Sequence, residues 1–154
     1  MTTIYLKSSD NQLFSMEEAA AKLSLKLKRI IEDKDRVVNN FIKFDNVKGI
    51  TLTKVIDYCR KHVISKDDAE ALKLFDQELV RNEDVVSMMF LIDAAMNLEI
   101  ESLFELFYPA LIDKLKGKTL HEIMDMFSTE DLDPVTAVCL DTVLRSLGLK
   151  KLNT

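Results

Sequence analysis

Apolar and polar residues alternate at the start of the chain and recur at helical spacing over most of the rest. Residues 3–7 and 12–15 have the pattern of strands, and the polar residues 8–11 between them predict a hairpin turn, because Asp and Asn tolerate left-handed backbone angles. The short segment 41–44 is β-prone and predicts a third strand. All strands are therefore expected near the N-terminus.

Helical spacing of apolar residues begins after the hairpin. Residues 16–22 are rich in Glu and Ala and predict a short helix, and Ser24 has the side chain of an N-cap for a second one. Thr51 is expected to cap the clearest amphipathic helix of the chain. Residues 65–73 are polar and charged, which predicts a loop. The apolar stripe of the helix behind Thr51 consists of Leu52, Val55, Ile56, Cys59 and Val63.

Helices dominate the second half of the chain. Residues 85–97 follow a helix start signal at Asn82 or Asp84, and they are so apolar that we expect a largely buried helix. Residues 101–115 predict another helix. Pro109 lies inside it and has no amide hydrogen to donate to the preceding turn, so a kink is expected there.

Two further helices complete this part. Thr119 precedes a short helix over residues 120–127, and Asp133 followed by Pro134 is a strong start signal for a last helix that ends near Leu147. Strands that come early and helices that come late predict an α+β fold and not a doubly wound sheet.

The composition is that of a folded domain. The chain has 154 residues, 47% hydrophobic and 31% charged, which suits one domain with a short extension. Its net charge of −5 disfavours nucleic acid as a partner, because an acidic chain repels phosphate groups. No apolar stretch is long enough to cross a bilayer and the first residues do not resemble a signal peptide, so no membrane partner is expected. Two cysteines make no disulfide framework, which favours the cytoplasm or the nucleus.

One short motif resembles part of a nucleotide-binding loop. Gly117, Lys118 and Thr119 match the last three positions of a P-loop. The first glycine of such a loop would fall at position 112, which is Ile112, and a helix is expected before it where the motif needs a strand. We therefore expect no nucleotide cofactor.

Cysteines and histidines are too few for a structural zinc site and badly placed for a catalytic pair. Cys59 and His62 are three residues apart, but Cys59 lies on the apolar stripe and His62 suits the helix end as a cation. Cys139 with His121 would be a nucleophile pair, yet the apolar neighbours of Cys139 favour its unreactive thiol form. The sequence indicates a protein-interaction module with no metal, no cofactor and no catalytic residues.

Five parts of the chain match one known family in order and spacing. The most specific is residues 54–62, Lys-Val-Ile-Asp-Tyr-Cys-Arg-Lys-His. The others are residues 4–10, 27–33, 91–95 with 98–100, and 116–119 with Glu122, Ile123 and Phe127. By these residues the chain resembles the Skp family, the adaptors of SCF-type ubiquitin ligases, over about residues 4–134.

The resemblance implies a POZ-like three-stranded sheet with surrounding helices over residues 1–115 and a helical extension over residues 116–154. It implies two interaction faces, one for a cullin and one for F-box proteins, and no active site. Met96 and Asn97 are expected to face the cullin. The residues expected to bind an F-box are Tyr108, Leu111, Leu115, Lys116, Gly117, Lys118, Thr119, Ile123 and Phe127.

Some residues depart from the family pattern. Family members commonly carry Asn-Tyr where this chain has Met96 and Asn97, and a tryptophan where it has Phe75. The acidic loop at residues 65–73 is shortened, and the tryptophan-containing tail is absent. We therefore expect weaker binding to a standard cullin than the family shows. The alternative is a Skp-like structural subunit of a non-ligase assembly, and a rival of another class is an enzyme with an unrecognised site.

The last predicted helix has a broad apolar face. We expect it to pack on the preceding helices, and we expect its exposed remainder to drive a symmetric homodimer when no F-box partner is bound. The residues of this face are Val135, Val138, Leu140, Val143, Leu144 and Leu147.

Overall fold

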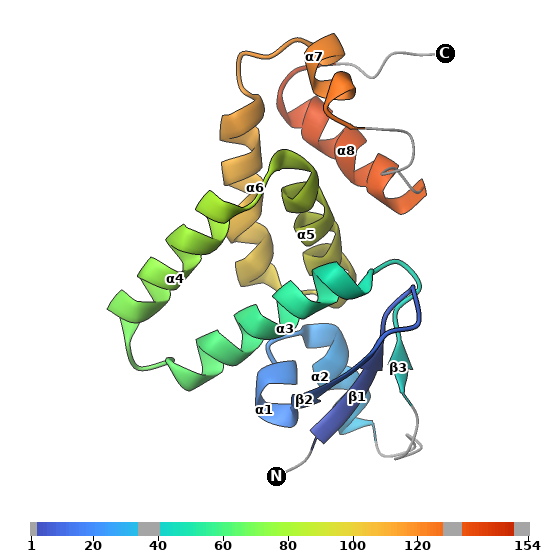
Figure 1. Ribbon diagram of the computed structural model, residues 1–154, viewed down its shortest axis with the longest axis vertical. Coiled ribbons are helices and arrows are strands. Elements are labelled where there is room, and N and C mark those ends of the chain that lie inside the picture. Colours follow the sequence, from blue (N-terminus) through green and yellow to red (C-terminus); the bar gives the residue numbers. More distant parts are fainter. Residues whose placement is uncertain (1–2, 34–40, 128–133, 150–154) are drawn as a thin grey trace.

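The computed structural model describes residues 3–33, 41–127 and 134–149, without the side chains of residues 134–136. The sheet, α1 and α2 lie at one end, α7 and α8 at the other, and α3 runs between them (Figure 1). This arrangement confirms the predicted α+β fold. Its elements are β1 (Thr3–Lys7), β2 (Leu13–Glu17), α1 (Glu18–Ala21), α2 (Leu25–Glu32), β3 (Ile42–Lys43), α3 (Gly49–Ile64), α4 (Ala69–Asn82), α5 (Val85–Leu98), α6 (Glu101–Leu115), α7 (Leu120–Asp125) and α8 (Pro134–Ser146).

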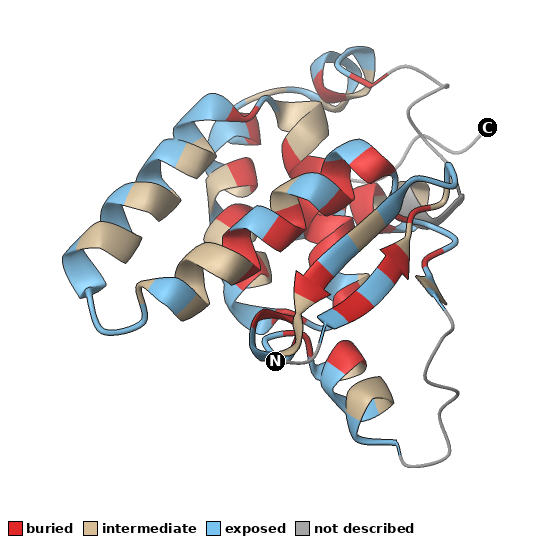
Figure 2. Ribbon diagram, turned by 60° about the horizontal axis from the view of Figure 1, so that its bottom comes forward, coloured by how far each residue is buried: buried red, intermediate tan, exposed pale blue. Residues whose placement is uncertain are grey.

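The sheet has the strand order β2-β1-β3. β1 pairs with β2 in antiparallel register and with β3 in parallel register. Ile4, Leu6 and Met16 are buried, whereas Tyr5 and Leu13 are exposed. Buried and exposed positions alternate along β1, as the colours of the ribbon in Figure 2 show. The alternation of apolar and polar residues therefore gives the sheet one buried face, as the sequence predicts.

Arg60 of α3 reaches the outer edge of the sheet. Its Nη2 donates a hydrogen bond to the carbonyl of Ser15 at 2.9 Å, and its Nε donates to Oε2 of Glu17 at 3.1 Å. β2 has β1 on one side only, so this arginine occupies part of the unpaired edge of the strand.

Helix α3 begins earlier than expected. Thr51 was predicted to be its N-cap, but α3 starts at Gly49 and Thr51 is buried inside it, so this prediction was wrong. The first backbone N–H of the helix is paired with a residue far away in the sequence: Gly49 N donates a hydrogen bond to Oδ1 of Asp10 at 2.9 Å. Hydrogen bonds from the Ser8 hydroxyl and from Gly49 N–H lower the pKa of Asp10. An added Cβ at position 49 would lie 2.3 Å from the amide oxygen of Gln12, which is the end of a flexible side chain and would have to move aside.

The predicted loop over residues 65–73 was also wrong in its second half. Helix α4 begins at Ala69, after a cap in which Asp68 accepts a hydrogen bond from Ala71 N at 3.1 Å. None of its residues is fully buried, and its ribbon in Figure 2 carries only intermediate and exposed positions. His62 Nε2 lies 2.8 Å from Oδ1 of Asp76, and Lys54 Nζ lies 2.7 Å from Oε2 of Glu83. The helix also packs on α6 and presents the partly buried side chains of Phe75, Leu79 and Val80 to the core.

Several predicted boundaries shift by a few residues. The helix expected over residues 16–22 is shorter, because β2 continues to Glu17 and α1 covers four residues. β3 covers only Ile42 and Lys43, and α7 ends at Asp125. Helix α6 continues through Pro109, and the kink expected there stays a prediction. The predicted cap Asp133 lies outside the described residues.

Helix α5 forms the centre of the core. Met88, Met89 and Ile92 are completely buried in it, as expected for this apolar segment, and it packs against α3, α6 and α8. Its C-terminal end is joined to α2, because the predicted N-cap Ser24 accepts from Leu27 N at 3.1 Å and donates its hydroxyl to the carbonyl of Leu98. Among the described helices, none is both long enough and apolar enough to span a membrane.

Candidate partner-binding surfaces

The corner between α6 and α7 is formed by local sequence signals. Gly117 has a φ of 85°, a left-handed conformation that favours glycine and lets the chain turn after Lys116. Thr119 then caps α7 with Glu122: Glu122 N donates to Thr119 Oγ1 at 3.1 Å, and Thr119 N donates to Glu122 Oε1 at 3.0 Å. The bond from Thr119 N–H lowers the pKa of Glu122. This reciprocal capping box fixes the direction of α7.

The residues expected to bind an F-box fall into two groups. The polar residues of the corner are accessible, with Lys116, Gly117 and Thr119 exposed and Lys118 partly exposed. The apolar ones lie in the core of the chain itself, at exposures of 0 to 6%. This second group consists of Leu111, Leu115, Ile123 and Phe127.

Tyr108, the remaining residue expected to bind an F-box, is half-buried and contacts α8. Tyr108 stacks on Phe104 with 4.9 Å between ring centroids, and its hydroxyl hydrogen-bonds that of Ser146 in α8. Helix α8 packs against α5, which confirms that its apolar face meets the preceding helices. Val138 on this helix remains 66% exposed. Of the predicted face, Leu140, Val143 and Leu144 are buried in the core, and Cys139 is buried beside them.

Met96 and Asn97, the expected cullin-facing pair, lie near the C-terminal end of α5. Met96 is 49% exposed, whereas Asn97 is half-buried. Asn97 borders a pocket of about 110 Å³ together with Lys26 of α2 and residues 43–47, which follow from β3. The sequence did not indicate this pocket, because its three segments are far apart along the chain.

A second hollow lies beside α4. It has a volume of about 620 Å³ and is lined by one face of α4, including Leu72, Asp76 and Val80, and by Leu106 of α6. This hollow was not predicted from the sequence, because a loop was predicted over residues 65–73, where α4 begins. The spacing of Leu72, Phe75 and Leu79 at i, i+3 and i+7 was the signal that could have revealed the helix.

The cysteines and histidines that the sequence analysis considered as catalytic or metal-binding residues do not form a reactive site in the structure. Burial raises the pKa of the thiols of Cys59 and Cys139 to about 12, so both are protonated at neutral pH. His62 pairs with Asp76, and His121 is exposed on α7. Within the described parts of the chain, no group of three or more His, Cys, Asp or Glu side chains could hold a metal ion.

These features define a class of protein: a POZ-type interaction domain with a helical extension. Residues 2–64 match the family model described as Skp1 family, tetramerisation domain. SKP1-like protein 14 of Arabidopsis thaliana is 36% identical over 128 residues, which cover 83% of this chain and 84% of that protein. SKP1-like protein 3 of the same plant is 36% identical over 140 residues, with the same coverage. The chain belongs to the Skp1 family.

Family membership settles the broad role of the chain. The family consists of non-catalytic adaptors that act through protein–protein contacts in SCF-type ubiquitin ligases. This protein is accordingly a Skp-type adaptor and not an enzyme, in agreement with the sequence analysis.

Proposed function

We propose that this protein links F-box-type substrate receptors to a cullin ubiquitin ligase. The observation that carries the proposal is the length of the similarity to Skp1-like proteins, 83% of the chain, which exceeds the POZ-like residues 1–115 and reaches into the extension at residues 116–154. A chain that preserves both parts is expected to use both faces. As a part of the ubiquitin conjugation pathway, the protein would act in the cytoplasm, the nucleus or both.

The F-box would meet the α6–α7 corner. Lys116 to Thr119 are accessible there and offer polar groups to an approaching helix. Leu111 and Phe127 lie beneath, in the cluster that also contains the buried face of α8. A partner that reaches these apolar side chains has to displace other buried residues of the chain, because Leu111 and Phe127 are 0% and 6% exposed.

The cullin would meet the surface of Met96 and Asn97. Met96 supplies exposed apolar area and a flexible thioether, which adapts to irregular surfaces. Asn97 supplies a polar side chain where the family commonly has a tyrosine. The loss of the aromatic ring supports weaker binding to a standard cullin.

A second candidate function follows from the same substitution. If Met96 and Asn97 no longer support cullin binding, the chain would be a Skp-like structural subunit of a non-ligase assembly. Both candidate functions share the F-box face and differ only at the cullin face.

Affinity purification of the tagged full-length chain from its native cell, read by mass spectrometry, separates these functions. Recovery of F-box proteins together with a cullin supports the ligase adaptor. F-box proteins or other helical partners without any cullin support the structural subunit. Recovery of neither class rejects both candidates.

A further inference from the structure

His62 lies at a junction of three helices. Its Nε2 is 2.8 Å from Oδ1 of Asp76 in α4, and its ring centroid is 4.1 Å from that of Tyr58, one turn earlier on α3. The Tyr58 hydroxyl donates in turn to Oγ of Ser102 in α6 at 2.8 Å. The ring of Phe75 in α4 meets the imidazole edge-on, with 6.4 Å between centroids. A side chain that can gain or lose a proton therefore lies where α3, α4 and α6 meet.

The histidine and its carboxylate partner are largely shielded from water. The side chains of His62 and Asp76 are 19% and 22% exposed. Burial raises the pKa of the neighbouring Tyr58 to about 12, so its hydroxyl stays neutral. Charges in such a partly buried place are screened less than charges on an open surface. The charge on His62 therefore affects how strongly α3 holds α4.

Three features of the junction attract a positive charge on His62. Asp76 presents a carboxylate at hydrogen-bond distance, and the tilted ring of Tyr58 presents a π-system. His62 also lies in the last turn of α3, where the helix dipole favours a cation. Protonation turns the contact with Asp76 into an ion pair between opposite charges.

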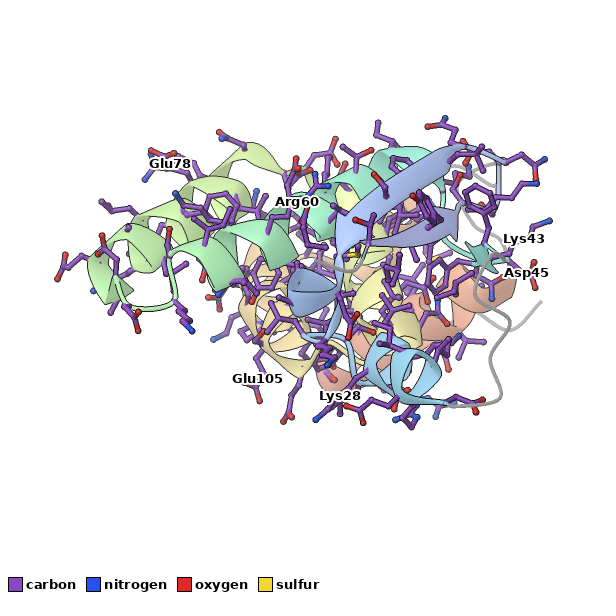
Figure 3. The ribbon with its side chains drawn as sticks, turned by 90° about the horizontal axis from the view of Figure 1, so that it is seen from below. Lys28, Lys43, Asp45, Arg60, Glu78 and Glu105 are labelled. Carbon is purple, nitrogen blue, oxygen red and sulfur yellow. The ribbon has the colours of Figure 1, made fainter. Side chains whose placement is uncertain are left out.

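The other charged groups of these helices act less directly. Lys61, beside the histidine in the sequence, holds its Nζ 6.0 Å from the centroid of the Phe75 ring and opposes the second positive charge. Arg60 is directed to β2 instead. Apart from the carboxylate in contact with the histidine, every charged residue of α4 and α6 is exposed, as Figure 3 shows for Glu78 and Glu105 at the edge of the molecule. Exposed charges are screened by water and salt, so the direct contact dominates.

The histidine contact lies at the border between two differently packed halves of α4. The side chains of α4 that pack on the core, Phe75, Leu79 and Val80, come at or after the middle of the helix. The first half borders the hollow of about 620 Å³ between α4 and α6, through Ala69 and Leu72. This half is not covered by α6, so its position depends strongly on the contact in the middle of the helix.

We propose that the contact between His62 and Asp76 is a pH-dependent latch that holds α4 on α3. With His62 protonated, the contact is a charge-assisted hydrogen bond, roughly twice as strong as a neutral one. With His62 neutral, Nε2–H can still donate to the carboxylate, but the positive charge is gone. Histidine changes its charge between about pH 5 and pH 8, so α4 is held firmly at the acidic end of this range and loosens toward the basic end. Loosening uncovers Phe75 and the α4 wall of the hollow. The inference does not depend on F-box or cullin binding.

Hydrogen exchange of the full-length chain, measured by mass spectrometry near pH 6 and near pH 8, tests the latch. Each rate is divided by the rate of an unfolded peptide at the same pH, so that protection factors are compared. We expect the protection of α4 to be at least about threefold higher near pH 6 than near pH 8, and that of α5 to change less. Equal protection of α4 at both pH values, or an equal change in α4 and α5, would overturn the proposal.

The chain has two histidines, and the second one provides a matched control. His62→Gln keeps a side-chain N–H donor without the charge and should remove the pH dependence of α4. His121→Gln changes the exposed histidine of α7 and should leave the pH dependence as in the wild type. Dependence that persists in His62→Gln, or that disappears in His121→Gln, would contradict the assignment to His62.

Asp76→Asn distinguishes the ion pair from a merely structural contact. The amide keeps a hydrogen-bond acceptor but removes the negative charge, so the protection of α4 should no longer be higher near pH 6. An Asp76→Asn chain that keeps the wild-type pH dependence would reject the latch, because another charge would then control α4. Circular dichroism verifies that each variant is folded. The wild-type comparison and the exposed His121→Gln control decide the outcome even where a variant at the junction fails to fold.

Discussion

The ion pair between Lys54 and Glu83 makes a quantitative prediction about how α4 is held. Lys54 Nζ lies 2.7 Å from Glu83 Oε2, and the two side chains are 30% and 9% exposed. The backbone carbonyl of Glu83 also accepts from Lys114 Nζ at 3.3 Å. Glu83 directly follows α4, so this pair joins the C-terminal end of the helix to α3.

Lys54→Met should destabilise the protein by about 3 kcal/mol, because it leaves the Glu83 carboxylate buried without a partner. Lys54→Met combined with Glu83→Leu should recover most of that loss, since two apolar side chains can replace a buried pair at little cost. The coupling energy between the two positions should be about 2 kcal/mol. Urea denaturation followed by far-ultraviolet circular dichroism gives the free energies of unfolding.

The matched control is the exposed pair of Lys22 and Glu18. These atoms are 3.3 Å apart on side chains that are 41% and 27% exposed, so Lys22→Met should cost less than about 0.5 kcal/mol. The reasoning would be refuted if Lys54→Met cost no more than Lys22→Met. Additive single changes at Lys54 and Glu83 would refute the coupling.

Four further predictions concern binding, pH and assembly. Phe127→Ala should weaken F-box binding by at least about 1 kcal/mol in calorimetry. The control Phe44→Ala removes a similarly buried ring far from the α6–α7 corner and should lower only the stability. An affinity of Phe127→Ala equal to that of the wild type would contradict the F-box assignment. Met96→Asn with Asn97→Tyr should strengthen binding to a standard cullin by about thirtyfold in surface plasmon resonance, and a wild type that already binds as tightly would sink this idea. Burial raises the pKa of both cysteine thiols from 9.0 to about 12, so the folded state keeps protons that the unfolded state releases. The urea midpoint of unfolding should therefore be highest below pH 9 and fall as the pH rises toward 12. A midpoint that does not change over this range would argue against the burial of the two thiols. The isolated chain should sediment as a dimer at high concentration, and a strict monomer would count against self-association.

The sequence predicted those parts of the fold whose signals are local. Ser24 and Thr119 cap the helices expected of them, and the left-handed turn falls on Asn11 with a φ of 65°. The start of α3 could not be found in this way, because its cap is Asp10, a residue 39 positions earlier. Helix α4 was missed because its first residues are mostly polar and charged and its one apolar face is only half-buried.

The sequence could place the F-box residues on helices but could not say whether they face a partner or the core. An apolar side chain such as Leu111 has the same signature in both positions, and only the structure shows that it is buried. The pocket at Asn97 escaped prediction for another reason. Its lining residues come from α2, from α5 and from residues 43–47, and no spacing along the chain joins them.

The contact of Arg60 with the edge of the sheet has a consequence for solubility. An open edge strand is a template on which a strand of another molecule can continue the hydrogen-bond ladder, the first step toward aggregated β-structure. Arg60 donates a hydrogen bond to the Ser15 carbonyl and places a bulky cation beside Glu17 at this point of β2. A strand that adds to β2 would have to displace Arg60 from this carbonyl, so the longer edge strand of the sheet is protected at its middle, while the other edge is formed by the two residues of β3.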